Sequence, residues 1–258
     1  MIRKKALHKL HVFGTFLFLY LPILVLVAFS FNTKTFPAPW HGFTLNWYRE
    51  LFRSYDLWES FFNSLKIASI TTLLSLFLST LLIYFLDSGS KKGRRLLPLF
   101  FGSLIVPETV LAVSLLSYFS LLDIPFGMPT LIVSHTILGL GFAIPILYTR
   151  YSDLDPKLKE ASLDLGATPW TTFFKITLPL LRPSLIATGL LVFVISFDDF
   201  ILSYFCAGNS IQTLSLYLLS MIRQGISPVV NALSTLLLLL SSLLVLLFFS
   251  PKIRTRIY

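Results

Sequence analysis

The chain has 258 residues, of which 55% are hydrophobic and only 13% are charged, and its mean hydropathy is +0.80. Soluble domains carry about a quarter charged residues, so this composition excludes an ordinary water-soluble globular protein and indicates a helical membrane protein. The formal net charge is +9, and the single cysteine, Cys206, excludes an internal disulfide and a cysteine-based metal site.

Six apolar stretches are long enough to cross about 30 Å of hydrocarbon as helices that rise about 1.5 Å per residue. They predict an all-α membrane protein with one transmembrane domain over residues 1–258. The first stretch could instead be a cleaved signal peptide, but it is longer than usual and no small-x-small cleavage site follows it. The predicted spans are about 11–31, 62–86, 96–119, 130–150, 184–206 and 232–250.

Lysine and arginine are distributed unevenly among the predicted loops. When both termini are placed in the cytoplasm, 16 of the 21 basic residues fall on that side. Positive charge is enriched in cytoplasmic loops, so this asymmetry predicts two cytoplasmic termini and accounts for the basic balance without nucleic acid. The basic residues on the outer side are Lys34, Arg49, Arg53, Lys66 and Arg223.

The outer loop at 32–61 is rich in aromatic residues. Trp47, Leu51 and Phe52 recur at helical spacing, which favours an amphipathic segment lying in the outer membrane interface. The same residues could also form a surface for an extracytoplasmic partner.

Glu108 lies in the predicted third span, directly after Pro107. A carboxylate in the membrane interior is costly, so it is a candidate for the solute pathway. The proline removes a backbone donor and can kink the helix, which frees carbonyl groups to line a cavity. A structural role in hydrogen bonding between helices is an equal alternative.

The cytoplasmic loop at 151–182 is polar and carries strong helix signals. Asp155-Pro156 is a good cap followed by a first-turn proline. Gly166 suits a left-handed C-terminal cap, and Thr168-Pro169 repeats the starting signal. The loop is therefore predicted to form a short helix, a glycine turn and a second short helix that Pro179 ends. Helices this short need tertiary packing to persist, and the alternative interpretation is an amphipathic hairpin that rests on the membrane surface.

The spacing of residues in this loop resembles the signature of ABC-importer inner-membrane permeases, Glu-Ala-Ala, three residues, Gly, nine residues, Ile-x-Leu-Pro. Ser162 replaces the second alanine of the signature. The resemblance implies that the first short helix couples the chain to a cytoplasmic ATPase, with Glu160 making a polar contact and Gly166 setting the turn. The matching positions are Glu160, Ala161, Gly166, Ile176, Leu178 and Pro179.

Asp198 and Asp199 are adjacent in the predicted fifth span. Neighbouring residues of a helix point about 100° apart, so one is expected to face the solute pathway and the other a neighbouring helix or subunit. With Glu108 they make three carboxylates and no lysine or arginine in the predicted membrane interior, which favours a cationic solute. Hydrogen bonding between helices is the structural alternative.

Further segments resemble the permeases of polyamine importers of the spermidine/putrescine type, nearly from end to end. They include SFDDF at 196–200 and YLLSMIRQGISPVVNALST at 217–235. Glu108 stands where an aspartate is expected in these proteins. The resemblance implies the six-span, type I ABC-importer permease fold and a polyamine substrate, although related permeases for other solutes share this framework.

The resemblance also implies a location in the bacterial inner membrane and several partners. These are an ABC ATPase subunit dimer, a second permease subunit, an extracytoplasmic solute-binding protein and membrane lipid. No G-x-x-x-x-G-K-[ST] phosphate loop occurs in the chain, so ATP hydrolysis is assigned to a partner, and we expect neither an enzyme nor a bound cofactor or metal.

Two other classes of protein remain as alternatives. A proton-driven secondary transporter would use Glu108 or Asp198 as relay groups. The polar loop at 151–182 argues against this class, because such a transporter has no ATPase to bind there. An intramembrane hydrolase would need a nucleophile and base within reach of each other. His135 is the only histidine in the interior of a predicted span, since His11 stands at the very start of the first one, and it is expected to be packed and hydrogen-bonded.

Overall fold

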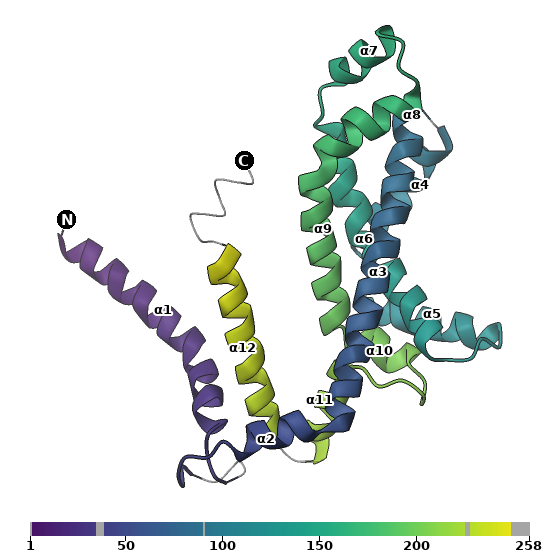
Figure 1. Cartoon of the computed structure of the whole chain (residues 1–258). Coiled ribbons are helices and arrows are strands. Elements are labelled where there is room, and N and C mark those ends of the chain that lie inside the picture. Colours follow the sequence, from purple (N-terminus) through teal and green to yellow (C-terminus); the bar gives the residue numbers. More distant parts are fainter. Residues whose placement is uncertain (1, 35–38, 90, 225–227, 249–258) are drawn as a thin grey trace. The chain divides into compact units, whose positions relative to one another are not determined.

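The computed structural model describes residues 2–34, 39–89, 91–224 and 228–248 (Figure 1). In this part of the chain the secondary structure is helical, apart from an isolated antiparallel bridge between Asn32 and Phe43. The chain divides into two compact units. One contains the residues up to Leu57 together with those from Leu218 onward, and the other is Trp58–Tyr217.

In the first unit, α12 packs against α1 and α2. Two contacts join α2 to the residues that directly follow α1. The Trp47 indole N–H donates to the carbonyl oxygen of Asn32 at 2.7 Å, and the hydroxyl of Tyr48 lies 2.8 Å from that of Ser30. The helical spacing predicted in the loop at 32–61 is confirmed by α2. The helices of this unit are α1 (Ile2–Phe29), α2 (Asn46–Arg53) and α12 (Pro228–Phe248).

The second unit contains most of α3 and the helices from α4 to α10. At one end of it, α7 and α8 form a hairpin beside the start of α9 (Figure 1). The helices are α3 (Tyr55–Asp87), α4 (Lys91–Ser103), α5 (Glu108–Leu121), α6 (Met128–Ser152), α7 (Pro156–Asp164), α8 (Pro169–Thr172), the π-helix η1 (Phe173–Thr177), α9 (Leu178–Asp198) and α10 (Ile201–Cys206), followed by α11 (Leu214–Gln224), which continues into the first unit.

The centre of the second unit is the contact of α3, α6 and α9 (Figure 1). A Cβ atom added to Gly139 of α6 would lie 2.5 Å from Ser75 Oγ of α3 and 2.9 Å from Val192 Cγ1 of α9. Gly189 of α9 approaches Leu76 of α3 in the same way, at 3.0 Å. The hydrophobic effect contributes little to helix association in lipid. Small residues stabilise such contacts instead, because they let the helix backbones approach closely.

Four helices of the described residues are long and apolar enough to cross a membrane, or five if the bent pair Gly93–Ser103 and Glu108–Leu121 is one span. The predicted all-helical membrane protein is therefore confirmed, while the count of six stays a prediction. The sixth span, 232–250, corresponds to α12, and its last two residues lie outside the described residues, as do Lys252, Arg254 and Arg256 of the tail. The four helices are His11–Phe29, Tyr55–Asp87, Met128–Ser152 and Pro169–Asp198.

The predicted third span, 96–119, is broken at the position where the sequence predicts a kink. Here α4 and α5 meet at an angle of 115°, because Pro107 has no N–H to donate and adopts an extended conformation, with φ −57° and ψ 135°. Glu108 is consequently the first residue of α5.

The predicted fifth span, 184–206, is also interrupted. It starts earlier, since α8, η1 and α9 run on as one candidate span, and it stops at Asp198. Asp199 is extended, with φ −62° and ψ 128°, and α10 begins two residues later. The two aspartates therefore flank a helix break, and the angle expected for neighbours on one helix does not apply to them.

The close packing at Gly139 makes a testable prediction. Gly139→Val is expected to destabilise the protein by about 1–3 kcal/mol, because the added atoms would meet Ser75 and the stiff side chain of Val192. Thermal unfolding in detergent should show a lower midpoint. Gly102→Val is the matched control, since nothing lies within 4 Å of a Cβ atom added there. Equal midpoints for the two variants would contradict this packing.

Candidate functional site

The polar hairpin has the capped structure that the sequence predicts. The Asp155 carboxylate accepts the backbone N–H of Lys157 at 3.0 Å, and Pro156 is the first residue of α7. Thr168 caps α8 in the same way, accepting the backbone N–H of Thr171 at 3.2 Å. Each cap satisfies a donor that the start of a helix leaves without an intrahelical partner.

Gly166 makes the turn between the two helices. Its φ is +84°, which a residue with a Cβ atom rarely adopts. Its N–H donates to the carbonyl of Leu163 at 2.9 Å, and the N–H of Ala167 donates to the carbonyl of Ser162 at 3.1 Å. These are the two bonds of a Schellman motif, so the left-handed cap predicted for this glycine is confirmed.

The inner face of the hairpin is fixed by a polar and an aromatic contact. Ser162 Oγ lies 2.9 Å from Thr172 Oγ1, and this pair is buried. Phe173 is 1% exposed, and its ring packs edge-on against Tyr84 of α3, with the ring centres 5.1 Å apart. The serine that replaces the second alanine of the motif therefore joins α7 to α8, which sequence reasoning did not anticipate.

The outer face of the hairpin is exposed and mixes charge with apolar surface. Glu160 and Ala161 are exposed. Leu165, at 89% exposure, and Trp170, at 59%, lie on the same hairpin. Within the described part of the chain, neither ion pair involves Glu160. This face has the composition of a docking surface, with large apolar groups beside the carboxylates of Glu160 and Asp164.

The end of the hairpin differs from expectation. Pro179 was predicted to end the second short helix, but the chain passes from α8 through η1 into α9 without a break. Proline lacks the N–H of the regular helical ladder, and the wider π turn directly before it accommodates this loss. Ile176, Leu178 and Pro179 are half-buried in this segment.

Asp199 is buried and fully engaged in contacts within the chain. Its carboxylate accepts the backbone N–H groups of Leu202 at 3.3 Å and Ser203 at 2.9 Å, which caps α10. Its Oδ2 atom also lies 3.3 Å from Nε2 of His135 on α6. The Nδ1 atom of that histidine lies 2.8 Å from Ser196 Oγ.

This polar network is structural, because its side chains are closed to solvent. His135 is 1% exposed and Ser196 is 4% exposed, so a hydrolytic substrate has no access to them. The prediction that His135 is packed and hydrogen-bonded is confirmed. The network explains the helix break, since the extended backbone at Asp199 lets its side chain reach the first turn of α10.

The three predicted pathway carboxylates therefore lie in different surroundings. Asp198, the last residue of α9, is exposed, whereas Asp199 is buried. Glu108 is partly buried at the start of α5 and has Asp199 as a neighbour. Two helix breaks, one before α5 and one before α10, thus bring Glu108 and Asp199 together. Among the described residues no group of three or more His, Cys, Asp and Glu side chains is arranged to hold a metal ion.

Replacing the turn glycine should loosen the hairpin. Gly166→Val is expected to cost about 1–2 kcal/mol, because a β-branched residue is strained at φ +84°. Hydrogen exchange at the amides of Gly166 and Ala167 should accelerate. Gly166→Asn should have a smaller effect, since asparagine tolerates the left-handed region. Unchanged protection in Gly166→Val would contradict the turn described here.

Comparison with known proteins places these features in a family. Residues 76–255 match the family described as "Binding-protein-dependent transport system inner membrane component". The spermidine/putrescine transport system permease protein PotC of Escherichia coli strain K12 is 36% identical over 230 residues, covering 89% of this chain and 87% of that protein. The putrescine transport system permease protein PotI of the same strain is 33% identical over 231 residues, covering 86% and 82%.

A solved structure has the same fold. It is the crystal structure of a bacterial ABC transporter involved in the import of the acidic polysaccharide alginate, and it covers 96% of this chain with a TM-score of 0.73 at 16% sequence identity. The match covers 97% of that chain. With the matched family and the two permease relatives, it establishes that this chain belongs to the inner-membrane permease subunits of binding-protein-dependent ABC importers.

Proposed function

We propose that this permease imports a polyamine. It would have six spans in the type I fold, with both termini in the cytoplasm. The choice of substrate rests on one observation: the chain is 36% identical to a spermidine/putrescine permease over 89% of its length. The carboxylates support a cationic solute, because Glu108 and Asp198 offer negative charge at two helix breaks.

The transport cycle needs energy from outside the chain. As a permease subunit of this family, the chain does not hydrolyse ATP itself, and it binds no cofactor in this proposal. A binding protein delivers the solute to a pathway between this chain and a second, similar permease. Two ATPase subunits bind on the cytoplasmic side, and their closure on ATP switches the pathway between outward-facing and inward-facing states.

The α7–α8 hairpin is the element through which the ATPase would act. Its exposed face carries Glu160 for a polar contact and Leu165 and Trp170 for an apolar one. Its turn is fixed by Gly166 and its inner face by the Ser162–Thr172 contact. A docked partner can therefore move the hairpin as one body. Membership of the family removes the reason to consider a proton-driven secondary transporter.

The docking role predicts the effect of removing the exposed carboxylate. Glu160→Ala is expected to lower solute uptake by about tenfold, the loss that corresponds to one charge-assisted hydrogen bond. Uptake should be measured in proteoliposomes that hold the whole importer, with the binding protein outside. Binding of solute to that protein should not change. Asp153→Ala, which removes an exposed carboxylate just before α7, is the control. Wild-type uptake in Glu160→Ala would exclude this role.

The pathway proposal separates the two neighbouring aspartates. Asp198→Asn is expected to reduce spermidine and putrescine uptake by about tenfold while the complex assembles normally, because an exposed charge facing the solute is lost. Asp199→Asn is expected to lower the midpoint of thermal unfolding, because His135 loses its buried charged neighbour. Uptake assays and melting curves on both variants check this division.

Two results would contradict this division of roles. Unchanged polyamine uptake in Asp198→Asn would remove that residue from the pathway. A wild-type importer that takes up neither spermidine nor putrescine, but another solute, would replace the polyamine in the proposal and leave the permease role intact.

A further inference from the structure

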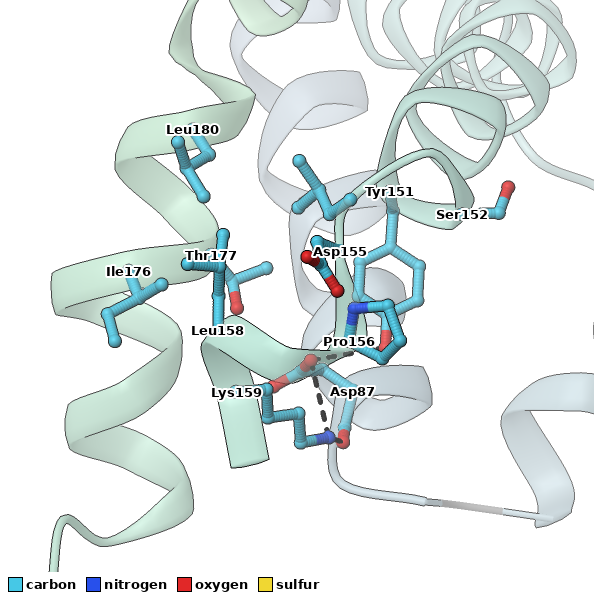
Figure 2. Close-up of a pocket in the computed structure, with 11 residues that line it drawn as sticks. Asp87, Tyr151, Ser152, Asp155, Pro156, Leu158, Lys159, Ile176, Thr177 and Leu180 are labelled. Carbon is cyan, nitrogen blue, oxygen red and sulfur yellow. Dashed lines mark hydrogen bonds and ion pairs between the residues drawn. The ribbon is translucent and has the colours of Figure 1, made fainter. Parts of the chain in front are cut away.

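A cavity of about 290 Å³ lies beside α7 (Figure 2). The end of α3 contributes Asp87, the last turn of α6 contributes Tyr151, and α7 contributes Lys159. Thr177 and Leu180 close it from η1 and α9. The cavity therefore separates the hairpin that faces the ATPase from the ends of three long helices.

The carboxylate of Asp87 joins three of these helices. Asp87 is the last residue of α3 and is 3% exposed. The Nζ atom of Lys159 lies 3.4 Å from its Oδ1 atom and also donates to its backbone carbonyl. The hydroxyl of Tyr151 donates to the same Oδ1 atom at 3.1 Å. Figure 2 shows these contacts converging on Asp87 from α7 and from α6.

The second oxygen of this carboxylate, Oδ2, is buried and has no hydrogen-bond partner in the described part of the chain. Burying a carboxylate without a partner is costly, so Asp87 depends on Lys159 and Tyr151 for its stability. The lysine, in contrast, is one-third exposed and sits on a helix of nine residues, which is too short to be stable without tertiary contacts.

Lys159 lies on the face of α7 that packs against the rest of the permease. Lys159 and Ser162 are three residues apart, so they lie on the same face of the helix. Ser162 contacts α8 and Lys159 contacts α3. Glu160 is exposed on the other side. One face of α7 is thus bonded to the body of the permease, while the other is left for a partner.

We propose that Asp87 is a positioning residue that ties the α7 helix to the end of the α3 span, so that a movement of α7 is passed into α3. This inference rests on the proposed role of α7 in coupling to the ATPase. The free Oδ2 atom offers Lys159 a second acceptor on the same carboxylate. The ion pair therefore persists when α7 shifts into the cavity, and α3 is pulled along instead of being released.

The test uses the complete importer in proteoliposomes and measures the number of ATP molecules hydrolysed per solute imported. Lys159→Met keeps the length of the side chain and removes its charge. We expect this ratio to rise by about 2- to 30-fold, the range for mutations that alter coupling between sites. Lys159→Arg, which keeps the charge, should restore a ratio near that of the wild type.

A double variant distinguishes positioning from simple stabilisation. Asp87→Asn combined with Lys159→Met removes both charges, so no buried carboxylate is left unpaired. If Asp87 positions α7, the double variant is as poorly coupled as Lys159→Met alone. If the double variant couples normally, the ion pair only offsets a buried charge and the proposal is overturned.

Two controls keep the outcomes separate. Lys175→Met removes an exposed lysine from the same loop and should leave the ratio unchanged. A normal ratio in Lys159→Met, in a complex that retains its ATPase, would overturn the role of Asp87 and leave the coupling hairpin in place. A wild-type chain that assembles with no ATPase would instead refute the proposed function of the hairpin.

Discussion

The buried contact between Asp199 and His135 holds the chain at the break between α9 and α10. Its atoms are 3.3 Å apart, and the same carboxylate caps α10. A charged group in a membrane protein interior must find partners inside the protein, because lipid offers none. Here this requirement is met where α9 ends at Asp198, which leaves Asp198 itself exposed at the break.

A second buried carboxylate, Asp87 at the end of α3, also finds its partners inside the protein. It forms an ion pair with Lys159 and accepts a hydrogen bond from the hydroxyl of Tyr151. At the Asp199 end, a buried carboxylate stabilises a helix break inside one body. At the Asp87 end, it links that body to a short hairpin whose other face is exposed. A permease needs both properties, since a rigid pathway must still respond to a partner that binds outside the membrane.

Local sequence predicted the hairpin in detail but the spans only in outline. The caps at Asp155 and Thr168 and the turn at Gly166 depend on residues within a few positions of each other, and all three are confirmed. Pro107 signalled the break before α5 as an expected kink, because proline lacks the N–H of the helical ladder. The break before α10 was missed, because hydropathy continues through residues 184–206 and no proline or glycine directly precedes Asp199 to mark it.

By itself, the sequence determined that this is a helical membrane protein, where its capped polar hairpin lies and which family it resembles. Those properties follow from hydropathy, from short-range capping and from the spacing of a few residues. Only the tertiary structure decided which aspartate is buried and which is exposed, and that Asp87 pairs with Lys159, 72 residues away. Contacts of this kind depend on how helices pack, and the periodicity of one helix carries no information about the atoms of another.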